Sequence, residues 1–259
     1  MQDVTYAVVT GASRGLGRAF AHALAERKQS LILVSRSKET LAALAEELET
    51  AHSISTLVFE CDLAAPSAGC RLARLLLDRR LSINLLVNNA GFGLRGSFLK
   101  LSLQRQMEML RLNNSAVVEL TYSLLPSLLG HSQAGIINVS STAGFQAVPY
   151  AGVYAATKSF LTSFSTGLQE ELRSSGVRVV TLCPGRILAS RPPASTEDSN
   201  RRFSFAYQLS EDVVERALEA LANGGGLVIP GFANKFSLIA QRFIPRRTVP
   251  KLVALLSRQ

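Results

Sequence analysis

The feature that most constrains the fold is a regular alternation of short β-branched runs with longer helical stretches. Seven runs have the length and the Val, Ile and Leu content of strands that are buried on both faces. These predicted strands are Val4–Thr10, Leu31–Ser35, Ser55–Glu60, Asn84–Asn88, Gly135–Ser140, Val177–Cys183 and Leu227–Pro230. The clearest helical patterns between them are Gly17–Gln29, Glu39–Ala51 and Val153–Ser174.

This alternation predicts a doubly wound α/β fold, because right-handed crossovers place helices on both faces of a parallel sheet. We expect a single domain over residues 1–259, built on one seven-stranded parallel sheet, since no linker-like stretch divides the chain. A content of 47% hydrophobic and 18% charged residues is enough to form a sizeable core. The sequence shows neither a membrane-spanning apolar run nor the pattern of a signal peptide.

One connection departs from the regular pattern. Arg186–Leu209 contains two prolines, several serines and mixed charges, and such long connections usually act as lids or mobile binding segments. We therefore expect it to be a substrate loop. Ser210 follows it and has the pattern of an N-cap for a helix over Glu211–Asn223.

Cysteine, histidine and charge patterns exclude several classes of function. Cys61, Cys70 and Cys183 are scattered without a CxxC pair, and the three histidines are equally dispersed. This spacing predicts no metal site and no disulfide framework, which favours a reducing, cytoplasmic compartment. The net charge is +9, but most basic residues are single and mixed with acids, unlike a nucleic-acid surface. We expect no nucleic-acid partner.

The C-terminal tail, about residues 231–259, carries six Lys or Arg residues and no acid, interleaved with apolar residues. This pattern is typical of a helix that lies on a membrane surface. Pro245 and Pro250, however, predict that any helix is broken into short pieces. The other interpretation, which we favour from the sequence, is that the apolar stripe packs on the body of the protein or on a second subunit.

A glycine-rich turn follows the first predicted strand and opens directly into a helix. Gly11 permits the tight turn, Gly15 lets the backbone approach a pyrophosphate, and Gly17 lets the helix pack closely on the strand. The helix N-terminus would offer free N–H groups to phosphate. A nucleotide-binding loop is therefore predicted at the start of the chain.

The end of the second strand indicates which nucleotide this loop would bind. An Asp or Glu there usually bonds the ribose 2′-hydroxyl of NAD, whereas this strand ends Val34-Ser35-Arg36 without an acid. Arg14 and Arg36 would together face a 2′-phosphate, which predicts NADP(H). The alternative is that both arginines are solvated surface residues.

A tyrosine and a lysine four residues apart, Tyr154 and Lys158, would share one face of a helix. A lysine charge about 4 Å away supplies on the order of 4 kcal/mol at an effective dielectric near 20. That matches the loss of about three pKa units that lets a tyrosine exchange protons near neutrality. By itself the pattern is also common in structural roles. Ser141 ends another strand, at the sheet edge where open α/β folds bind ligands.

Taken in order and spacing, these motifs resemble the short-chain dehydrogenase/reductase family. The resemblance runs from about residue 5 to 230, and its motifs are the glycine loop, Asp62, Asn88-Asn89-Ala90-Gly91, the Ser141, Tyr154 and Lys158 set, and Pro184-Gly185. The ending Val228–Lys235 also resembles the bacterial DltE-type subgroup. The resemblance implies a Rossmann fold, an NADP(H) cofactor, a small carbonyl substrate and a homo-oligomer, either a dimer or a tetramer.

The resemblance also implies catalytic roles. Tyr154 would be the general acid in reduction and the base in oxidation. Lys158 would bond the nicotinamide ribose and lower the pKa of Tyr154, and Ser141 would polarise the substrate carbonyl. Asn113 would hold a proton-relay water, with Asn114 as the competing assignment.

For the cofactor, the resemblance implies that Asp62 meets the adenine amine and that Ala90 and Gly91 pass close to the adenosine. Many members carry a Thr shortly after Pro-Gly to bond the nicotinamide amide, and this chain has none there, so backbone groups or Ser190 would substitute. The cofactor-binding residues implied are Gly11, Ser13, Arg14, Gly15, Leu16, Gly17, Arg36, Asp62, Leu63, Asn89, Ala90, Gly91, Tyr154, Lys158, Pro184 and Gly185.

The expected substrate pocket is apolar, which suits a hydrophobic ketone, aldehyde, steroid-like or 3-oxoacyl compound better than a free sugar. Phe145 and Val148 could equally be core residues. Two rival functions remain on the same fold: a non-catalytic NADP-binding sensor and a membrane-surface adaptor. A sensor would not need the complete Asn113, Ser141, Tyr154 and Lys158 set. The expected pocket residues are Phe92, Leu94, Phe145, Val148, Tyr150, Phe203, Phe205 and Tyr207.

Overall fold

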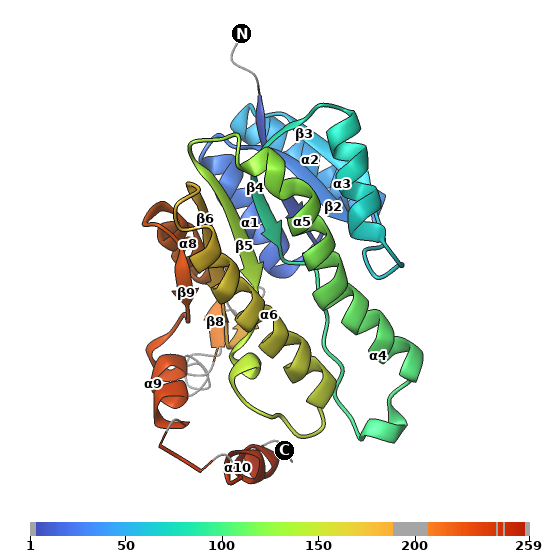
Figure 1. Ribbon diagram of the computed structural model, residues 1–259. Helices are drawn as coiled ribbons and strands as arrows, with labels where there is room; N and C mark the ends of the chain where they lie inside the picture. Colours follow the sequence, from blue (N-terminus) through green and yellow to red (C-terminus); the bar gives the residue numbers. More distant parts are fainter. Residues whose placement is uncertain (1–3, 189–206, 242, 246, 257–259) are drawn as a thin grey trace, which may run out of the picture.

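The computed structural model describes residues 4–188, 207–241, 243–245 and 247–256. Its main sheet has seven parallel strands in the order β3-β2-β1-β4-β5-β6-β9, which confirms the predicted doubly wound sheet (Figure 1). Each strand begins and ends within two residues of its predicted range. The strands are β1 (Thr5–Thr10), β2 (Ser30–Ser35), β3 (Thr56–Glu60), β4 (Ser82–Asn88), β5 (Ala134–Val139), β6 (Val177–Leu182) and β9 (Gly226–Val228).

Helices cover both faces of this sheet (Figure 1). α1 (Gly15–Glu26), α2 (Lys38–His52) and α8 (Ser210–Ala222) pack on one face, and α3 (Ala68–Asp78), α5 (Ala116–Leu128) and α6 (Gly152–Glu171) lie on the other. Successive strand residues point to opposite faces, so Ala7 and Val9 join the first core while Val8 joins the second. All three are fully buried, which is why the strands read as continuous apolar runs.

The strand order places the ligand-binding edge of the sheet. From β1 the chain winds outward through β2 to β3, then returns to place β4 on the other side of β1. Open α/β sheets form a crevice where the strand order reverses in this way, beyond the carboxyl ends of the strands. The turns after β1 and β4 therefore meet in that crevice.

The connection over residues 186–209 has a short strand at each end, which differs from the irregular loop that the sequence predicts. β7 (Arg186–Leu188) and β8 (Tyr207–Leu209) pair in parallel and form a separate two-stranded sheet. Residues 189–206, including Ser190, Phe203 and Phe205, lie outside the described part of the chain.

The prediction that Ser210 caps a helix is wrong by one position. Ser210 is the first residue of α8 and follows the N-cap residue Leu209, which makes no side-chain capping bond. The buried hydroxyl of Ser210 donates instead to the carbonyl of Leu188 in β7, at 3.3 Å. A long-range partner, created by the β7–β8 pairing, takes the place of the local cap.

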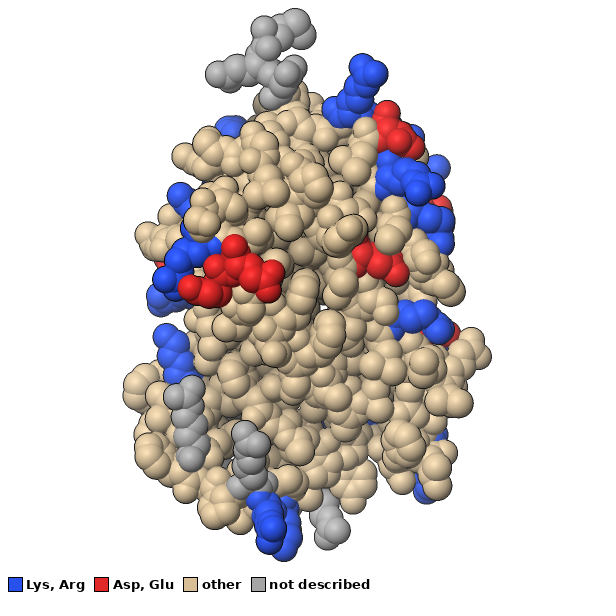
Figure 2. Space-filling model, viewed as in Figure 1, with Lys and Arg blue, Asp and Glu red and all other residues tan. Residues whose placement is uncertain are grey.

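The C-terminal tail forms two short helices, α9 (Phe232–Gln241) and α10 (Val249–Leu256). Pro250 is the second residue of α10, in the first turn, where a proline removes no helical hydrogen bond, so it does not break this helix. Of the two forms of the favoured interpretation, packing on the body does not hold for α9, since Phe232, Phe236 and Ile239 are exposed, and packing on a second subunit stays a prediction. In the lower part of Figure 2, where α9 and α10 lie, the described residues are tan and blue, without red.

No helix in the described ranges is both long enough and apolar enough to cross a membrane.

Substitution of Gly17 by Ala is expected to destabilise the fold. A Cβ at this position would lie 2.1 Å from the carbonyl oxygen of Gly11, so helix α1 would have to move away from the glycine turn. Overpacking of this kind typically costs about 1–3 kcal/mol. Chemical denaturation should show this loss for Gly17→Ala.

The matched control is Gly167→Ala in α6. A Cβ there meets nothing within 4 Å, so the change should stabilise the helix by up to about 1 kcal/mol. Equal effects of the two substitutions would contradict the packing role of Gly17.

Candidate active site

The turns after β1 and β4 are joined by a cluster of hydrogen bonds around Thr10. Its hydroxyl donates to the carbonyl of Val87 at 3.1 Å and accepts from the backbone N–H groups of Asn89 and Ala90, each at 3.0 Å. The Asn89 side-chain amide returns a bond to the carbonyl of Thr10 at 2.8 Å. These bonds hold the glycine turn and the Asn88–Gly91 turn together at the reversal of strand order.

A cavity of about 870 Å³ opens at this edge of the sheet. It collects residues from the turns after β1 to β6, which are far apart in the sequence. Of the implied cofactor residues all but Gly17 line it: Gly11, Ser13, Arg14, Gly15, Leu16, Arg36, Asp62, Leu63, Asn89, Ala90, Gly91, Tyr154, Lys158, Pro184 and Gly185. Ser141 lines it too.

The N-terminus of α1 faces this cavity with no side-chain cap. Arg14 is the N-cap residue and its side chain makes no capping bond, so the first N–H groups of the helix are left for another acceptor. Gly15 has a φ of +55° and open space where a Cβ would lie. Gly17 is buried behind the turn and permits its close approach to α1. This arrangement fits a pyrophosphate bound at a helix N-terminus.

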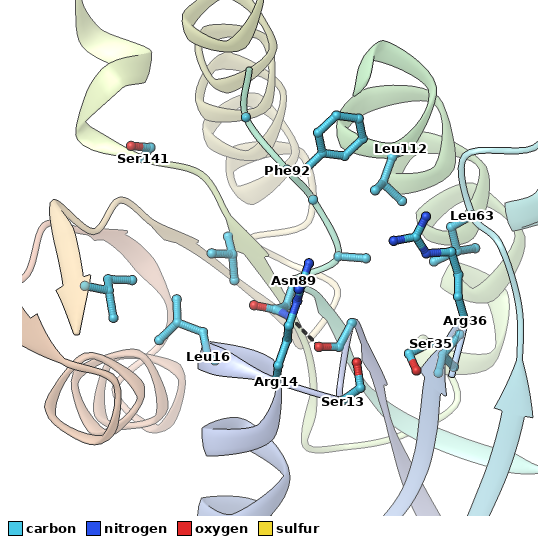
Figure 3. A pocket seen from close by; sticks show the side chains of 18 of the residues that line it. Ser13, Arg14, Leu16, Ser35, Arg36, Leu63, Asn89, Phe92, Leu112 and Ser141 are labelled. Carbon is cyan, nitrogen blue, oxygen red and sulfur yellow. Dashed lines mark hydrogen bonds between the residues drawn. The ribbon is translucent and has the colours of Figure 1, made fainter. Parts of the chain in front are cut away.

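Two cations and two hydroxyls border the cavity beyond β2. Arg14 and Arg36 are exposed and both line it (Figure 3). Ser37 and Thr40 at the start of α2 also line it, with their hydroxyls 2.7 Å apart. Guanidinium groups and hydroxyls are the donors that a phosphate monoester requires. The sequence interpretation included the arginines but missed the hydroxyls.

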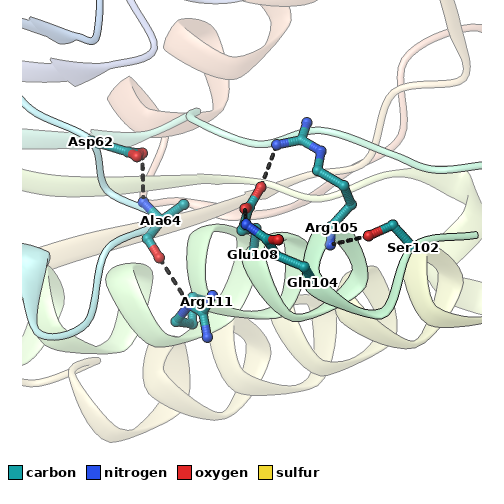
Figure 4. A network of polar contacts seen from close by, with 7 residues as sticks. All are labelled: Asp62, Ala64, Ser102, Gln104, Arg105, Glu108 and Arg111. Atoms are coloured by element: carbon teal, nitrogen blue, oxygen red, sulfur yellow. Dashed lines mark hydrogen bonds and ion pairs between the residues drawn. The ribbon is translucent and has the colours of Figure 1, made fainter.

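The turn after β3 is tied to the helices that follow β4 (Figure 4). Asp62 accepts the N–H of Ala64 at 3.0 Å, and the Arg111 side chain donates to the carbonyl of Ala64 at 2.9 Å. Arg105 of α4 (Leu103–Leu110) pairs with Glu108 and lies over the ring of Phe92, 4.7 Å from its centroid. Arg105 and Phe92 both line the cavity, and no local sequence pattern joins them.

The sequence-predicted Ser141, Tyr154 and Lys158 come together at the other end of the cavity. Lys158 is buried, and its ammonium donates to the carbonyl of Val139 at the end of β5, at 2.8 Å. The same nitrogen lies 5.9 Å from the centroid of the Tyr154 ring, which shows that both side chains lie on one face of α6. The Ser141 hydroxyl accepts the N–H of Ala143 at 3.1 Å.

The pKa of Tyr154 is raised in the structure, and the lowering by Lys158 that the resemblance implies stays a prediction. Burial raises the pKa of Tyr154 above 10.0, and the hydrogen bond with Ser141 only partly offsets this. Burial also lowers the pKa of Lys158 from 10.5 to about 8. Loss of water around each group is the largest cause of its shift. A neutral Tyr154 is the form that can donate a proton.

Asn113 lies in a short π-helical segment, η2 (Arg111–Ser115), between α4 and α5. Its side chain accepts the N–H of Phe92 at 3.2 Å and donates to the Phe92 carbonyl and the Thr157 hydroxyl, each at 3.0 Å. Asn114 donates to the carbonyl of Thr157 at 2.9 Å. Asn113 thus joins the turn after β4 to α6 beside Tyr154. Such π segments often occur at functional sites, and the sequence gives no signal of this one.

The predicted apolar pocket residues do not all line the same cavity. Phe92 lines the large cavity, while Leu94, Val148 and Tyr150 line a second cavity of about 320 Å³ against η1 (Phe98–Lys100) and α4. Phe145, in η3 (Thr142–Phe145), is exposed and lines neither of these two cavities. Tyr207 lies in β8, with the Arg186 guanidinium 6.0 Å from its ring centroid.

Comparison with known proteins defines the class of this chain. Residues 5–199 match the family described as short chain dehydrogenase. The chain belongs to this family of oxidoreductases.

Two relatives of known name are similar over most of the chain. Ketoacyl reductase HetN of Nostoc sp. is 33% identical over 216 residues, which cover 83% of this chain and 75% of that protein. The very-long-chain 3-oxoacyl-CoA reductase of Anas platyrhynchos is 35% identical over 183 residues, which cover 69% of this chain and 58% of that protein.

Solved structures share the fold. A 7β-hydroxysteroid dehydrogenase superposes with a TM-score of 0.85 and 96% coverage of both chains at 22% identity. A short-chain dehydrogenase from Sphingobium yanoikuyae in complex with NADPH is 26% identical, with a TM-score of 0.76 and coverage of 92% and 93%. A relative from Burkholderia phymatum in complex with NAD is 25% identical, with a TM-score of 0.77 and coverage of 95% and 94%. Relatives of this kind therefore bind either nicotinamide nucleotide.

The stability of the protein is expected to rise between about pH 8 and pH 9 because of Lys158. Above the lowered folded pKa of about 8, the folded chain releases a proton that the unfolded chain keeps until near 10.5. The free energy of unfolding should rise by on the order of 1 kcal/mol per pH unit in this window. Above pH 9 Cys183 opposes the rise, because burial raises its pKa to about 11.

Denaturant titrations at about pH 8 and about pH 9 would measure this rise. The comparison is Lys158→Met, which keeps the buried stem and removes the titrating group. The variant should lose the rise, and an unchanged pH slope would contradict the assignment.

Proposed function

We propose that this chain is an NADP(H)-dependent oxidoreductase that transfers a hydride between the nicotinamide and the carbonyl or secondary alcohol of an apolar substrate. The observation that carries this proposal is the single cavity that contains the glycine turn, two arginines and the Ser141, Tyr154 and Lys158 set. The cofactor would supply the hydride. The residues of the chain would bind the substrate oxygen and handle its proton.

The proton chemistry follows from the state of the two buried side chains. Tyr154 stays neutral because burial raises its pKa, so its phenol would donate a proton to the substrate oxygen during reduction. Ser141 faces the phenol and would donate a second hydrogen bond to that oxygen. Lys158 is held against the carbonyl of Val139, and its ammonium would stabilise the phenolate left behind.

The preference for NADP(H) rests on charge at the end of β2. Arg36 and the hydroxyls of Ser37 and Thr40 line the cavity there, and Arg14, which follows β1, lines the same cavity. Ser35, at the tip of the strand, is where an acid would bond the ribose of NAD. Two positive charges and two hydroxyls favour a 2′-phosphate over a free 2′-hydroxyl.

An apolar substrate is favoured by the walls around Tyr154. Leu94, Val148 and Met109 line the smaller cavity next to it, and Phe92 lines the larger one. The names of similar proteins include ketoacyl, 3-oxoacyl-CoA and hydroxysteroid compounds, all of which combine a carbonyl or hydroxyl with a large apolar body. We propose a compound of this class.

Tyr154→Phe tests the chemistry. The substitution keeps the ring and removes the transferable proton, so turnover should fall by about 10²–10⁴-fold while the fold persists. NADPH consumption would be followed with a panel of apolar ketones, aldehydes and 3-oxoacyl thioesters. Tyr122→Phe, at an exposed position on α5, is the control and should keep wild-type turnover. Wild-type protein that binds NADPH yet turns over none of the panel would favour the sensor instead.

Arg36→Ala tests the cofactor assignment. Each charge-assisted bond to the 2′-phosphate is worth about 1.5–3 kcal/mol, so affinity for NADPH should fall roughly 10- to 150-fold while affinity for NADH stays the same. Titration of both nucleotides by calorimetry would measure this. Arg27→Ala, at the other end of α1 and paired with Glu215, is the control. A wild-type protein that prefers NADH would overturn the assignment.

A further inference from the structure

The outer face of α9 carries an uninterrupted apolar stripe that nothing in the described chain covers. Phe232, Phe236 and Ile239 lie one helical turn apart, and Phe243 follows two residues beyond the end of the helix. They are 84%, 63%, 55% and 84% exposed. The rings of Phe232 and Phe236 stack, with centroids 6.4 Å apart. Large apolar residues grouped in this way mark a contact surface.

The opposite face of α9 is attached to the body. Asn234 donates to the carbonyl of Pro230 at 2.9 Å and to the side chain of Gln208 at 3.3 Å. Leu238, one turn on, is half-buried. The helix is therefore fixed in orientation, with its phenylalanines directed away from the protein.

The charged residues of α9, α10 and their connection that the structure describes are all positive. Lys235 lies within α9, Arg247 shortly precedes α10, and Lys251 lies in the first turn of α10. All three are exposed. The sequence has no acidic residue from 231 to 259. An apolar stripe bordered by cations matches a surface that is apolar inside and anionic outside, as the face of a lipid bilayer is.

The inner face of α9, opposite the stripe, adjoins the catalytic cavity. A Cβ added at Gly185, which lines the cavity, would lie 2.6 Å from the Asn234 amide in the first turn of α9. The same helix contacts η3, which follows Ser141 directly. A surface docked on α9 would adjoin the substrate side of the site.

We propose that α9 and the start of α10 form an interfacial docking surface for anionic lipid. Phe232, Phe236, Ile239 and Phe243 enter the boundary between headgroups and acyl chains. Lys235, Arg247 and Lys251 contact the headgroups. In this orientation the protein sits on the membrane beside the opening of its cavity, where apolar compounds concentrate.

A second copy of the chain fits this surface less well. A two-fold contact would bring the same patch together from both copies. The cations of each copy would then face those of the other, with no acid in residues 231–259 to pair with them. Charge complementarity therefore favours an anionic lipid surface, rather than a second copy of the chain, as the partner of α9 and the start of α10.

The test is co-sedimentation of the full-length protein with vesicles of phosphatidylcholine alone or mixed with phosphatidylserine. We expect binding to the mixed vesicles that weakens as salt is raised, because salt screens the headgroup charge. Lys235→Gln with Lys251→Gln should weaken it roughly fivefold per residue. Phe232→Ser with Phe236→Ser should weaken it by roughly tenfold or more per residue.

The matched control is Leu99→Ser with Tyr122→Ser, which removes two exposed apolar side chains on η1 and α5 and should leave vesicle binding unchanged. Thermal melts of each variant would verify that the fold persists. Wild-type protein that stays in solution with mixed vesicles would overturn the proposal. So would binding that survives loss of both phenylalanines, or a change of oligomeric state in the Phe232, Phe236 variant, which would assign the stripe to a second copy.

Discussion

The cluster of hydrogen bonds around Thr10 is the constraint on which the rest of the site depends. One hydroxyl satisfies two backbone N–H groups of the turn after β4 and one carbonyl within β4, so two turns that are about eighty residues apart become one rigid unit. Buried polar groups must be paired in this way, and the pairing fixes the distance between the turns. The glycine turn can then approach Asn89 and Ala90 so closely that a side chain at Gly11 or Gly17 would collide with them or with the turn itself.

A second constraint is the burial of a cation at the carboxyl edge of the sheet. The ammonium of Lys158 donates a hydrogen bond to the carbonyl of Val139, which offsets part of the cost of burying it. The Ser140 hydroxyl donates to the backbone carbonyl of the same lysine and fixes its place in α6. Asn138, one residue earlier in β5, links to Asn88 in β4 and to Ser165 in α6. These buried bonds set the position of α6 relative to the strands, and with it the position of Tyr154. The position of the reactive side chains thus follows from the hydrogen bonds that pair the buried polar groups at this edge of the sheet.

The sequence predicted the fold well because its signals are local or strictly periodic. Val8 and Val9 belong to an apolar run that only a strand buried on both faces explains, and the neighbouring runs repeat this pattern. The two local errors have different physical causes. Ser210 looks like a cap in isolation, but a carbonyl of β7 competes for its hydroxyl. The tail is broken into short helices as predicted, with Pro245 between them, but Pro250 does not act as a breaker because a proline in the first turn of a helix is harmless.

For the site, the sequence by itself determined which residue types stand at the ends of the strands: the glycines after β1, the asparagines after β4, Ser141 after β5 and the Tyr154–Lys158 pair in α6. Only the tertiary structure decided what those groups do to one another. It placed Arg105 over Phe92, brought Arg14 and Arg36 to one cavity, and let burial raise the pKa of Tyr154. It also turned the phenylalanines of α9 outward. The spacing of residues in the sequence fixes which side chains are neighbours along one strand or helix. The solvation of a side chain, and with it its pKa, depends on every group that packs around it, and these groups come together only when the whole chain has folded.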